Sequence, residues 1–485
     1  MSTVTISLIS HTNAGKTTLA RTLLGRDVGE VRDAPHVTTE AAAYTLIDAG
    51  DARLVLWDTP GFGDSARLAR RLAHERNPIG WFLSEVWDRF RDRAFFLAQR
   101  AVRNVRDDAD VVLYLVNAAE DPGDAGYLAS ELTVLAWIGK PVLVLLNQTG
   151  PPRGPEADAQ DESRWRSALA ARAVVRGVVA FDAFARCWVQ EFTLFDDVAR
   201  VLPADRAAAF APLAAAWRAR REAQFDESMA ALAGVVATAA CARVIVPRTA
   251  MLRRIGTALG IAADPARGEA AEAAKALARA VSADMESAMG RLLAIHGLSG
   301  RAGAEVVAKI DEDIAHEGPL DEGKAAAMGG VVSGALTGLA ADLAAGGLTF
   351  GAGMFTGAVL GALGGAGVAR AFNVARGQTD ETIRWDDAFL VRLTALALLR
   401  YLAVAHYGRG RGAFADGEAP VFWRPRVTAE LAARHERLAA ILARRGPDCD
   451  AAAVAAALAP LLRDTMLAVL AGLYPDAGTE PARGA

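Results

Sequence analysis

Two hydrophobic patterns divide the chain at about residue 200. Before that point, short apolar runs such as Val4–Ile9, Arg53–Trp57 and Pro141–Leu146 predict buried strands. Beyond it, strand signals are scarce, and apolar positions recur at helical spacing in segments such as Ala207–Val235 and Pro265–Leu293. We therefore expect an N-terminal domain that contains a sheet, followed by a mainly helical C-terminal part.

Further elements are expected on both sides of this division. Val174–Ala180 is another candidate strand. Near the C-terminus, Trp385–Ala405, Val427–Arg445 and Ala451–Leu473 have the pattern of helices. Pro460 is expected to kink or break the last of these, because proline lacks the backbone donor that an interior helical position needs.

The segment 325–371 differs from the helices around it, since it consists mostly of Gly, Ala and other apolar residues. Glycines four residues apart lie on one face of a helix and let two backbones approach closely. We therefore expect a hairpin of two helices, and its stretch Leu343–Val368 is long enough to span a bilayer. Membrane contact, self-association and burial between the flanking helices all stay open. The repeating glycines are Gly330, Gly334, Gly338, Gly353, Gly357, Gly361 and Gly365.

A phosphate-binding loop follows the first predicted strand. Residues 10–18 are Ser-His-Thr-Asn-Ala-Gly-Lys-Thr-Thr, which matches Gly-x-x-x-x-Gly-Lys-Ser/Thr with Ser10 in place of the first glycine. Backbone N–H groups would wrap the β-phosphate, Lys16 would bridge the β- and γ-phosphates, and the hydroxyl of Thr17 would bind Mg²⁺. The loop residues assigned to the nucleotide are Ser10, Asn13, Ala14, Gly15, Lys16, Thr17 and Thr18.

A second motif, Asp58-Thr59-Pro60-Gly61, follows the predicted strand Arg53–Trp57. A carboxylate at the end of a buried strand is suited to hold Mg²⁺ through water, so Asp58 is the expected second magnesium residue. The N–H of Gly61 would then reach the γ-phosphate. Together the two motifs predict a site for a nucleoside triphosphate with magnesium.

With these motifs the first 200 residues resemble small GTPases of the translation-factor class, of the Era, TrmE and Der type. The resemblance rests on Thr12–Thr17, Pro35–Thr39 and Asp58–Gly61. It implies an α/β P-loop domain with a mostly parallel sheet that binds GTP and GDP and hydrolyses GTP with Mg²⁺. The chain is also similar to a group of proteins that join such a G domain to a long helical part of unknown function.

The resemblance assigns roles to further positions. Thr38 matches the switch I threonine that closes on Mg²⁺, with Thr39 as the alternative. Asn13 matches an asparagine that helps to hold K⁺ in potassium-stimulated members, although a turn also explains an asparagine there. Phe62 stands where other GTPases carry a glutamine that orients water, which implies slow turnover. The residues expected to act in catalysis are Lys16, Thr38 and Gly61.

The guanine motif departs from the family pattern Asn-Lys-x-Asp. Asn147 is in place and would tie the base loop to the phosphate loop, but Gln148 replaces the lysine and Gly150 replaces the aspartate that accepts two hydrogen bonds from guanine. Such a contact is worth about 1–3 kcal/mol, so guanine preference is an open question. Asp158 and Asp161 are candidates to substitute. The expected base-contacting residues are Asn147, Gln148, Asp182 and Ala183.

Net charge and cysteine usage limit which binding partners and which cellular compartment we expect. The formal net charge of the 485-residue chain is −4, which gives no basic footprint for nucleic acid, so DNA is excluded and RNA is not expected as a partner. Cys187, Cys241 and Cys449 have neither metal-ligand nor disulfide spacing, which indicates a reducing cytosol. The N-terminus lacks the pattern of a signal peptide. The expected location is the cytoplasm, with association at the inner membrane if the hairpin enters a bilayer.

The expected function is a nucleotide switch, in which a slow GTPase acts on a helical effector domain. One alternative is a membrane-remodelling or scaffold protein whose assembly is gated by nucleotide, and another is a ribosome- or RNA-associated GTPase. The expected parts are a G domain over 1–200, a helical domain over 201–324, the Gly-rich apolar hairpin over 325–371, C-terminal helices over 372–475 and a tail over 476–485.

Overall fold

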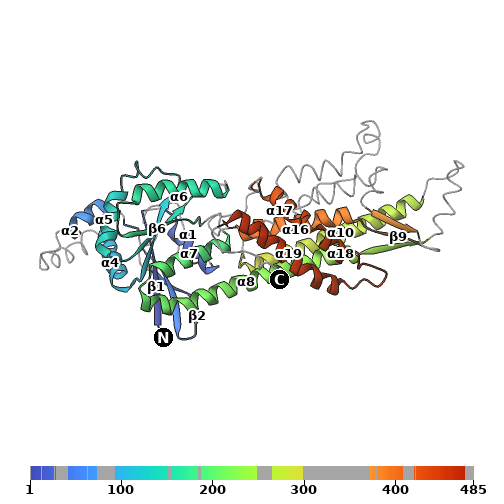
Figure 1. Cartoon of the computed structure of the whole chain (residues 1–485), viewed down its shortest axis with the longest axis horizontal. Coiled ribbons are helices and arrows are strands. Elements are labelled where there is room, and N and C mark those ends of the chain that lie inside the picture. The colour runs from blue at the N-terminus through green and yellow to red at the C-terminus, as the bar shows by residue number, and fades with distance from the viewer. Residues whose placement is uncertain are drawn as a thin grey trace. The chain divides into compact units, whose positions relative to one another are not determined.

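The chain is described by a computed structural model, in which the polypeptide forms two compact units (Figure 1). The first unit comprises Met1–Ala223, Ala405–Arg411 and Ala471–Thr479, and the second comprises the remainder. The structure describes residues 2–11, 14–26, 28, 42–59, 61–62, 64–73, 93–150, 154–183, 187–247, 265–298, 372–376, 380–407, 420 and 422–475.

A six-stranded sheet of order β2-β3-β1-β4-β5-β6 lies at the centre of the first unit. Every neighbouring pair is parallel except β2 and β3, which are antiparallel. The mostly parallel sheet expected at the N-terminus is thus confirmed. The strands are β1 (Ser2–Ser10), β2 (Ala42–Ala49), β3 (Ala52–Asp58), β4 (Val111–Asn117), β5 (Val142–Asn147) and β6 (Val175–Ala180).

Helices cover both faces of this sheet, as continuous apolar strands such as β4 and β5 require. One face packs against α2, α4, α5 and α6 in a core that contains Tyr114, Phe95 and Trp165. The helices α1 and α7 contact strands β1, β3 and β6. The helices are α1 (Lys16–Leu24), α2 (Ser65–Ala73), α4 (Arg93–Asp108), α5 (Leu128–Ile138), α6 (Pro155–Leu169) and α7 (Trp188–Val201).

The parallel pairing brings the carboxyl ends of five strands to one edge of the sheet. In the register, Leu8 lies beside Asp58 and Asn117 lies beside Asn147. Because ligands of open α/β sheets bind outside the carboxyl ends of the strands, this edge is where a functional site is expected.

The long helix α8 (Ala204–Cys241) runs from the first unit into the second, which is mainly helical as expected. A small antiparallel sheet of order β7-β9-β8, which the sequence analysis did not predict, also lies in the second unit. Its strands are β7 (Arg243–Pro247), β8 (Phe372–Arg376) and β9 (Asp380–Trp385). The other helices are α10 (Pro265–Ile295), α16 (Asp387–Ala405), α17 (Trp423–Ala432), α18 (His435–Leu442) and α19 (Ala451–Leu473).

The expected break of the last helix at Pro460 is wrong, because α19 continues through this exposed proline, with the buried Leu458 and Leu461 on either side in the core. A kink at Pro460 stays a prediction. The segment expected as one helix over 427–445 is two helices, α17 and α18, which separate at Arg434. The predicted domain boundaries stay predictions, while the division between the two units falls between Ala223 and Gln224, inside α8.

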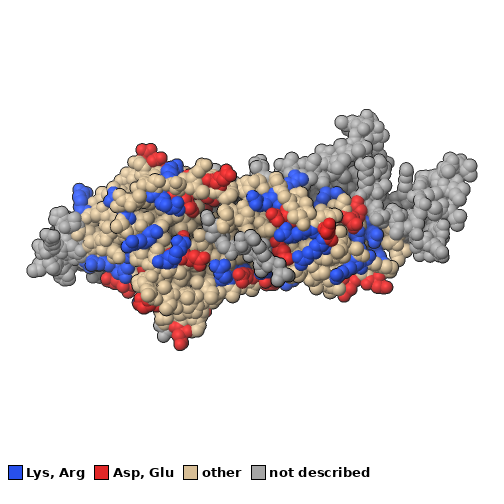
Figure 2. All heavy atoms as spheres, in the orientation of Figure 1, with Lys and Arg blue, Asp and Glu red and all other residues tan. Residues whose placement is uncertain are grey.

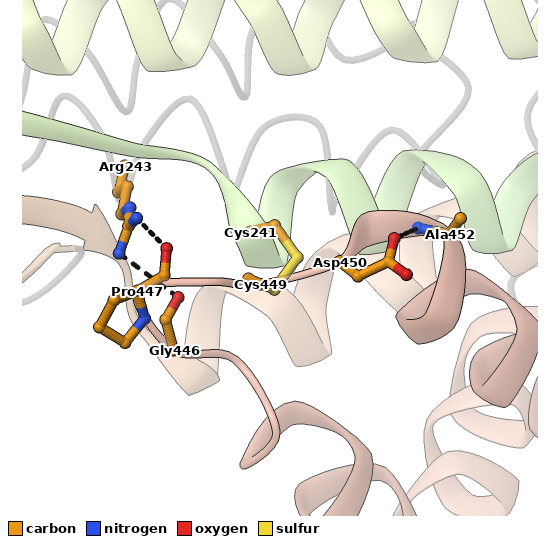
Figure 3. The surroundings of a disulfide bond; sticks show 7 residues. All are labelled: Cys241, Arg243, Gly446, Pro447, Cys449, Asp450 and Ala452. Atoms are coloured by element: carbon orange, nitrogen blue, oxygen red, sulfur yellow. Dashed lines mark hydrogen bonds between the residues drawn. A yellow bond between two sulfur atoms is a disulfide. The ribbon is translucent and has the colours of Figure 1, made fainter.

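The expectation of no disulfide is also wrong, because Cys241 and Cys449 are joined in the second unit (Figure 3). Their sequence separation is 208 residues, and only the fold brings them together. Cys187 is fully buried in the first unit.

Two helices of the second unit, α16 and α19, are long and apolar enough to cross a membrane by length and composition alone. This is weak evidence, since buried core helices pass the same test, and 67% of the apolar window of α16 is buried within the protein. The Gly-rich hairpin expected over 325–371 lies outside the described residues.

Candidate functional site

The phosphate loop connects the end of β1 to the start of α1. Gly15 precedes the helix with φ of 88°, a left-handed conformation that glycine adopts without a steric penalty. The Nζ of Lys16 donates to the Oγ of Ser10 at 2.8 Å, and Ser10 in turn donates to the carbonyl oxygen of His11. Lys16 is buried, and this burial lowers its pKa. The loop therefore encloses a cation that an anion above it would stabilise.

The two motifs meet at Thr17 and Asp58. The hydroxyl of Thr17 donates to Oδ2 of Asp58 at 2.6 Å. Asp58 is 1% exposed, and its burial raises the pKa of its carboxyl group, against the opposing effects of the Thr17 hydrogen bond and the Lys16 charge. Among the described residues, Oδ1 of Asp58 has no hydrogen-bond partner. A buried carboxylate oxygen without a partner, next to a hydroxyl, fits the oxygen ligands that Mg²⁺ takes.

The second motif packs directly against the phosphate loop. The hydroxyl of Thr59 donates to the carbonyl oxygen of Leu8 at 2.5 Å, and the N–H of Phe62 donates to the carbonyl oxygen of Ser10 at 3.4 Å. The side chain of Phe62 is buried in the core, so it does not point toward solvent at the site. Gly61, between these anchors, is partly exposed.

Asn147, at the end of β5, links three segments. Its Nδ2 donates to the carbonyl oxygen of Ala14 in the phosphate loop at 2.7 Å, and its Oδ1 accepts from the N–H of Ala183, after β6, at 2.7 Å. The side chain of Asn147 is fully buried. Asn147 is thus hydrogen-bonded both to the phosphate loop and to the loop after β6, which is the link expected of it from the sequence.

The loop after β5 is hydrogen-bonded to the carboxylate of Asp182, which belongs to the loop after β6. Oδ2 of Asp182 accepts from the N–H of Thr149 at 3.0 Å and from its hydroxyl at 2.9 Å, and Asp182 is 5% exposed. Gly150 has φ of 83°, a region that side chains rarely adopt. Asp161, in contrast, lies on α6 and forms an ion pair with Arg164 at 3.2 Å.

Sequence reasoning missed one buried cluster beside the phosphate loop. Glu131 on α5 is fully buried, accepts from the hydroxyl of Tyr114 at 2.5 Å, and lies 2.7 Å from Nδ1 of His11. The ring of His11 stacks on Tyr127 with 4.2 Å between ring centroids. A signal was present, because Glu131 is the only charged residue of the apolar helix α5. This cluster attaches the phosphate loop to α5.

Three predicted site residues lie outside the described residues: Asn13, Thr38 and its alternative Thr39. Their roles toward K⁺ and Mg²⁺ stay predictions. Within the described part of the chain, no group of three or more His, Cys, Asp or Glu side chains is placed to hold a metal ion.

Comparison with known proteins covers both parts of the chain. Residues 5–148 match the family described as 50S ribosome-binding GTPase. Residues 166–446, more than half of the chain, match the family described as domain of unknown function DUF3482. The chain belongs to the DUF3482 family. In this member a P-loop GTPase domain of the Era/Der-like class precedes the DUF3482 region.

Relatives of this DUF3482 protein are similar to its N-terminal part. GTPase Der of Mycobacterium tuberculosis is 28% identical over 154 residues, which are 32% of this chain and 27% of that protein. GTPase Era of Heliobacterium modesticaldum is 25% identical over 143 residues, which are 30% of this chain and 38% of that protein. The chain thus spans well under two thirds of the length of either relative.

Solved structures with partial likeness to this DUF3482 protein include Aquifex aeolicus Era bound to GDP and aluminium fluoride. That likeness has a TM-score of 0.30 and 17% identity, and covers 42% of this chain and 58% of that chain. Another is mGMPPNP-bound NFeoB from S. thermophilus, with a TM-score of 0.24 and 18% identity over 43% of this chain and 75% of that chain.

Proposed function

We propose that this protein is a GTP-driven switch, in which the N-terminal domain binds GTP with Mg²⁺, hydrolyses it slowly and acts on the DUF3482 region. The observation that carries the proposal is the convergence of three motifs at one sheet edge. Lys16 contacts Ser10, Thr17 contacts Asp58, and Asn147 contacts Ala14. The first contact lies within the phosphate loop, and the other two join that loop to the ends of β3 and β5, which a nucleotide would bridge.

Each residue of the phosphate loop has a role in this proposal. Lys16 leaves the Ser10 hydroxyl and binds the β- and γ-phosphate oxygens, whose negative charge offsets the effect of burial on the Lys16 pKa. Backbone N–H groups of Ala14, Gly15 and Thr18 bind the phosphates at the positive end of α1. Thr17 and Asp58 hold Mg²⁺, which supplies positive charge to the transferring phosphoryl group.

Hydrolysis on this proposal is slow because, among the residues that the structure describes, no side-chain base is placed at the site. Phe62 is buried, so a backbone N–H such as that of Gly61, together with the switch residue Thr38, orients the attacking water. A K⁺ ion held at Asn13 would add positive charge near the phosphates. Turnover in K⁺ compared with Na⁺ tests that role, and identical rates in the two salts would remove it.

We assign base recognition to Asp182. Guanine presents N1–H and a 2-amino group side by side, and an ionised carboxylate accepts both. The family position for that carboxylate is Gly150, whose backbone conformation disfavours a side chain. Asp182 occupies the neighbouring loop, beside Ala183, and Thr149 fixes its carboxylate. Gln148 and Ala183 complete the loops around the base.

Competition among nucleotides tests this function most simply. With Mg²⁺ present, GTP should displace a fluorescent guanine nucleotide at lower concentration than ATP or xanthosine triphosphate, and phosphate release should follow GTP addition. If ATP displaces it better than GTP, the base assignment is wrong and the phosphate site remains. If no triphosphate displaces it, the proposed function is wrong.

A second candidate is nucleotide-gated assembly on a membrane, favoured by the apolar helices α16 and α19 and by the composition of residues 325–371. Flotation with liposomes, with GDP or a non-hydrolysable GTP analogue, tests it. Flotation that depends on the nucleotide supports this candidate, and its absence with both nucleotides removes it.

RNA association is a third candidate. A solved Era structure contains nucleotides of 16S ribosomal RNA, and the matched family is described as ribosome-binding. Against it stands the net charge of −4, and basic side chains alternate with acidic ones on the face seen in Figure 2. Sedimentation with ribosomal subunits in the GTP-bound form tests it, and no co-sedimentation would exclude it.

A further inference from the structure

The disulfide of the second unit joins two element ends that are far apart in the sequence. Cys241 is the last residue of α8, and Cys449 lies two residues before α19, with 5.4 Å between the two Cα atoms (Figure 3). Both cysteines are partly exposed, so a small thiol in solution can reach them. They belong to no motif of the nucleotide site.

Non-covalent contacts hold the same two segments together without the sulfur–sulfur bond. Arg243, two residues after Cys241, donates to the carbonyl oxygens of Pro447 and Gly446, the second at 3.4 Å (Figure 3). Within the second segment, Asp450, next to Cys449, accepts from the N–H of Ala452 at 2.9 Å and caps the start of α19, which fixes the backbone beside Cys449. Because these bonds do not involve the sulfurs, the two thiols remain neighbours after reduction.

We propose that Cys241 and Cys449 form a thiol–disulfide exchange site whose reaction partners are low-molecular-weight thiols and their disulfides. In the closing direction, the thiolate of one cysteine attacks a small disulfide RSSR, which forms a mixed disulfide and releases RS⁻. The second cysteine then attacks the protein sulfur of that mixed disulfide and releases the second RS⁻. Two protein thiols are oxidised by two electrons, and RSSR is reduced to two RSH.

The exchange acts on the stability of the second unit. The bond closes a loop of the chain that contains β7, α10, β8, β9, α16, α17 and α18. Closing so long a loop restricts the unfolded chain more than the folded one, so the oxidised form is the more stable. The residues of the candidate nucleotide site all precede Cys241 and lie outside the loop.

The alternative is a permanent structural disulfide. An exchange site and a permanent disulfide differ in how the folded protein responds to small thiols. Full-length protein is equilibrated in buffers with varied ratios of reduced to oxidised glutathione, alkylated, and analysed by peptide mass spectrometry. The proposal expects the bond between Cys241 and Cys449 to pass from open to closed across this range. A bond that survives excess reduced glutathione in the folded protein, or thiols that never pair, would overturn it.

Variants separate the exchange from a general loss of folding. Cys241→Ser and Cys449→Ser should each lower the melting temperature by roughly 5 to 15 °C relative to oxidised wild type and equal reduced wild type. Cys187→Ser should respond to glutathione as wild type does. Equal melting temperatures for oxidised and reduced wild type would contradict the stability claim.

The hydrogen bonds from Arg243 to Pro447 and Gly446 are tested by the rate at which the reduced cysteine pair closes to the disulfide. Arg243→Met should slow closing of the reduced pair at least several-fold, because the two segments lose the contacts that keep the thiols adjacent. Arg291→Met, which removes an exposed arginine paired with Glu227, is the matched control and should close at the wild-type rate. An Arg243→Met protein that closes as fast as wild type would show that these hydrogen bonds do not position the thiols.

Discussion

The hydroxyl of Thr17 donates to the carboxylate of Asp58 at 2.6 Å, although 41 positions separate the two residues. The contact follows from the sheet. Strands β1 and β3 run parallel, with Leu8 beside Asp58, so the start of α1 lies above the end of β3. The same pair is the proposed magnesium site, and two predictions depend on it.

Asp58→Asn should weaken Mg²⁺-dependent GTP binding at least tenfold, a loss of about 1.4 kcal/mol. An amide keeps the size of the side chain but removes the negative charge that a divalent ion needs. Isothermal calorimetry with and without Mg²⁺ measures the loss. Asp48→Asn is the matched control, because Asp48 is on the same sheet but pairs with Arg53 in solvent. Equal affinities for wild type and Asp58→Asn would exclude Asp58 from the metal site.

The raised pKa of Asp58 predicts how binding depends on pH. Because its folded pKa lies above its unfolded value, the folded protein holds this proton more tightly. Asp58 alone therefore makes the nucleotide-free protein less stable as pH rises from the unfolded pKa of Asp58 through its folded pKa. Magnesium needs the deprotonated carboxylate, so the rise in melting temperature on adding Mg²⁺ and GTP should shrink as pH falls from neutral. In Asp58→Asn this pH dependence should be weaker, because only the titration of the triphosphate itself is left. A rise of constant size down to the acid range would contradict the assignment.

Asp182→Asn should exchange guanine preference for xanthine preference. An amide cannot accept both donors of guanine, but its NH₂ group can donate to the 2-carbonyl of xanthine while its oxygen accepts from N1–H. GTP affinity should fall at least tenfold and xanthosine triphosphate affinity should rise, as measured by nucleotide competition. A purely structural role for Asp182 would lower both affinities together.

Asp161→Asn is the control for this exchange, because its carboxylate pairs with Arg164 on α6, and it should leave the preference unchanged. If Asp161→Asn exchanges the preference and Asp182→Asn does not, the assignment of the base-reading carboxylate is wrong.

Glu131→Gln should destabilise the first unit by about 1–3 kcal/mol, because the fully buried carboxylate accepts from Tyr114 and contacts His11. GTP affinity should also fall, since His11 belongs to the phosphate loop. Urea unfolding and calorimetry measure the two effects. Glu156→Gln, at an exposed position of α6, should change neither. An unchanged urea midpoint in Glu131→Gln would show that the cluster is not needed.

The parts of the site that sequence predicts are those where chemistry is encoded in neighbouring residues. The loop from Ser10 to Thr18 and the motif at Asp58 are each short, contiguous sequence patterns. Each directly follows a predicted strand, so parallel pairing of the two strands is sufficient to bring both motifs to the same edge of the sheet. Asn147 follows the same logic, because it ends an apolar strand. In the structure Lys16 contacts Ser10, Thr17 contacts Asp58 and Asn147 contacts Ala14, while their roles toward a nucleotide stay predictions.

What sequence did not predict depends on contacts between distant segments. Asp182 was expected in a base-contacting loop, but its hydrogen bonds with Thr149, which join two loops 33 residues apart, were not predicted. The disulfide joins cysteines separated by 208 residues. The strands β8 and β9 of the small sheet lack the continuous apolar run by which the strands of the first unit were predicted, since their sequences are FNVAR and DETIRW. The helix α19 is not interrupted at Pro460, because packing of the buried Leu458 and Leu461 outweighs the tendency of proline to end a helix.

The central claim is that the N-terminal loop binds a triphosphate with magnesium, and direct calorimetric titration of GTP tests it. Wild type should release heat and bind one equivalent. Lys16→Ala should lose at least 100-fold in affinity, about 2.7 kcal/mol, while the control Lys140→Ala should bind as wild type. No binding heat for wild type with GTP and Mg²⁺, or full affinity in Lys16→Ala, would contradict the account.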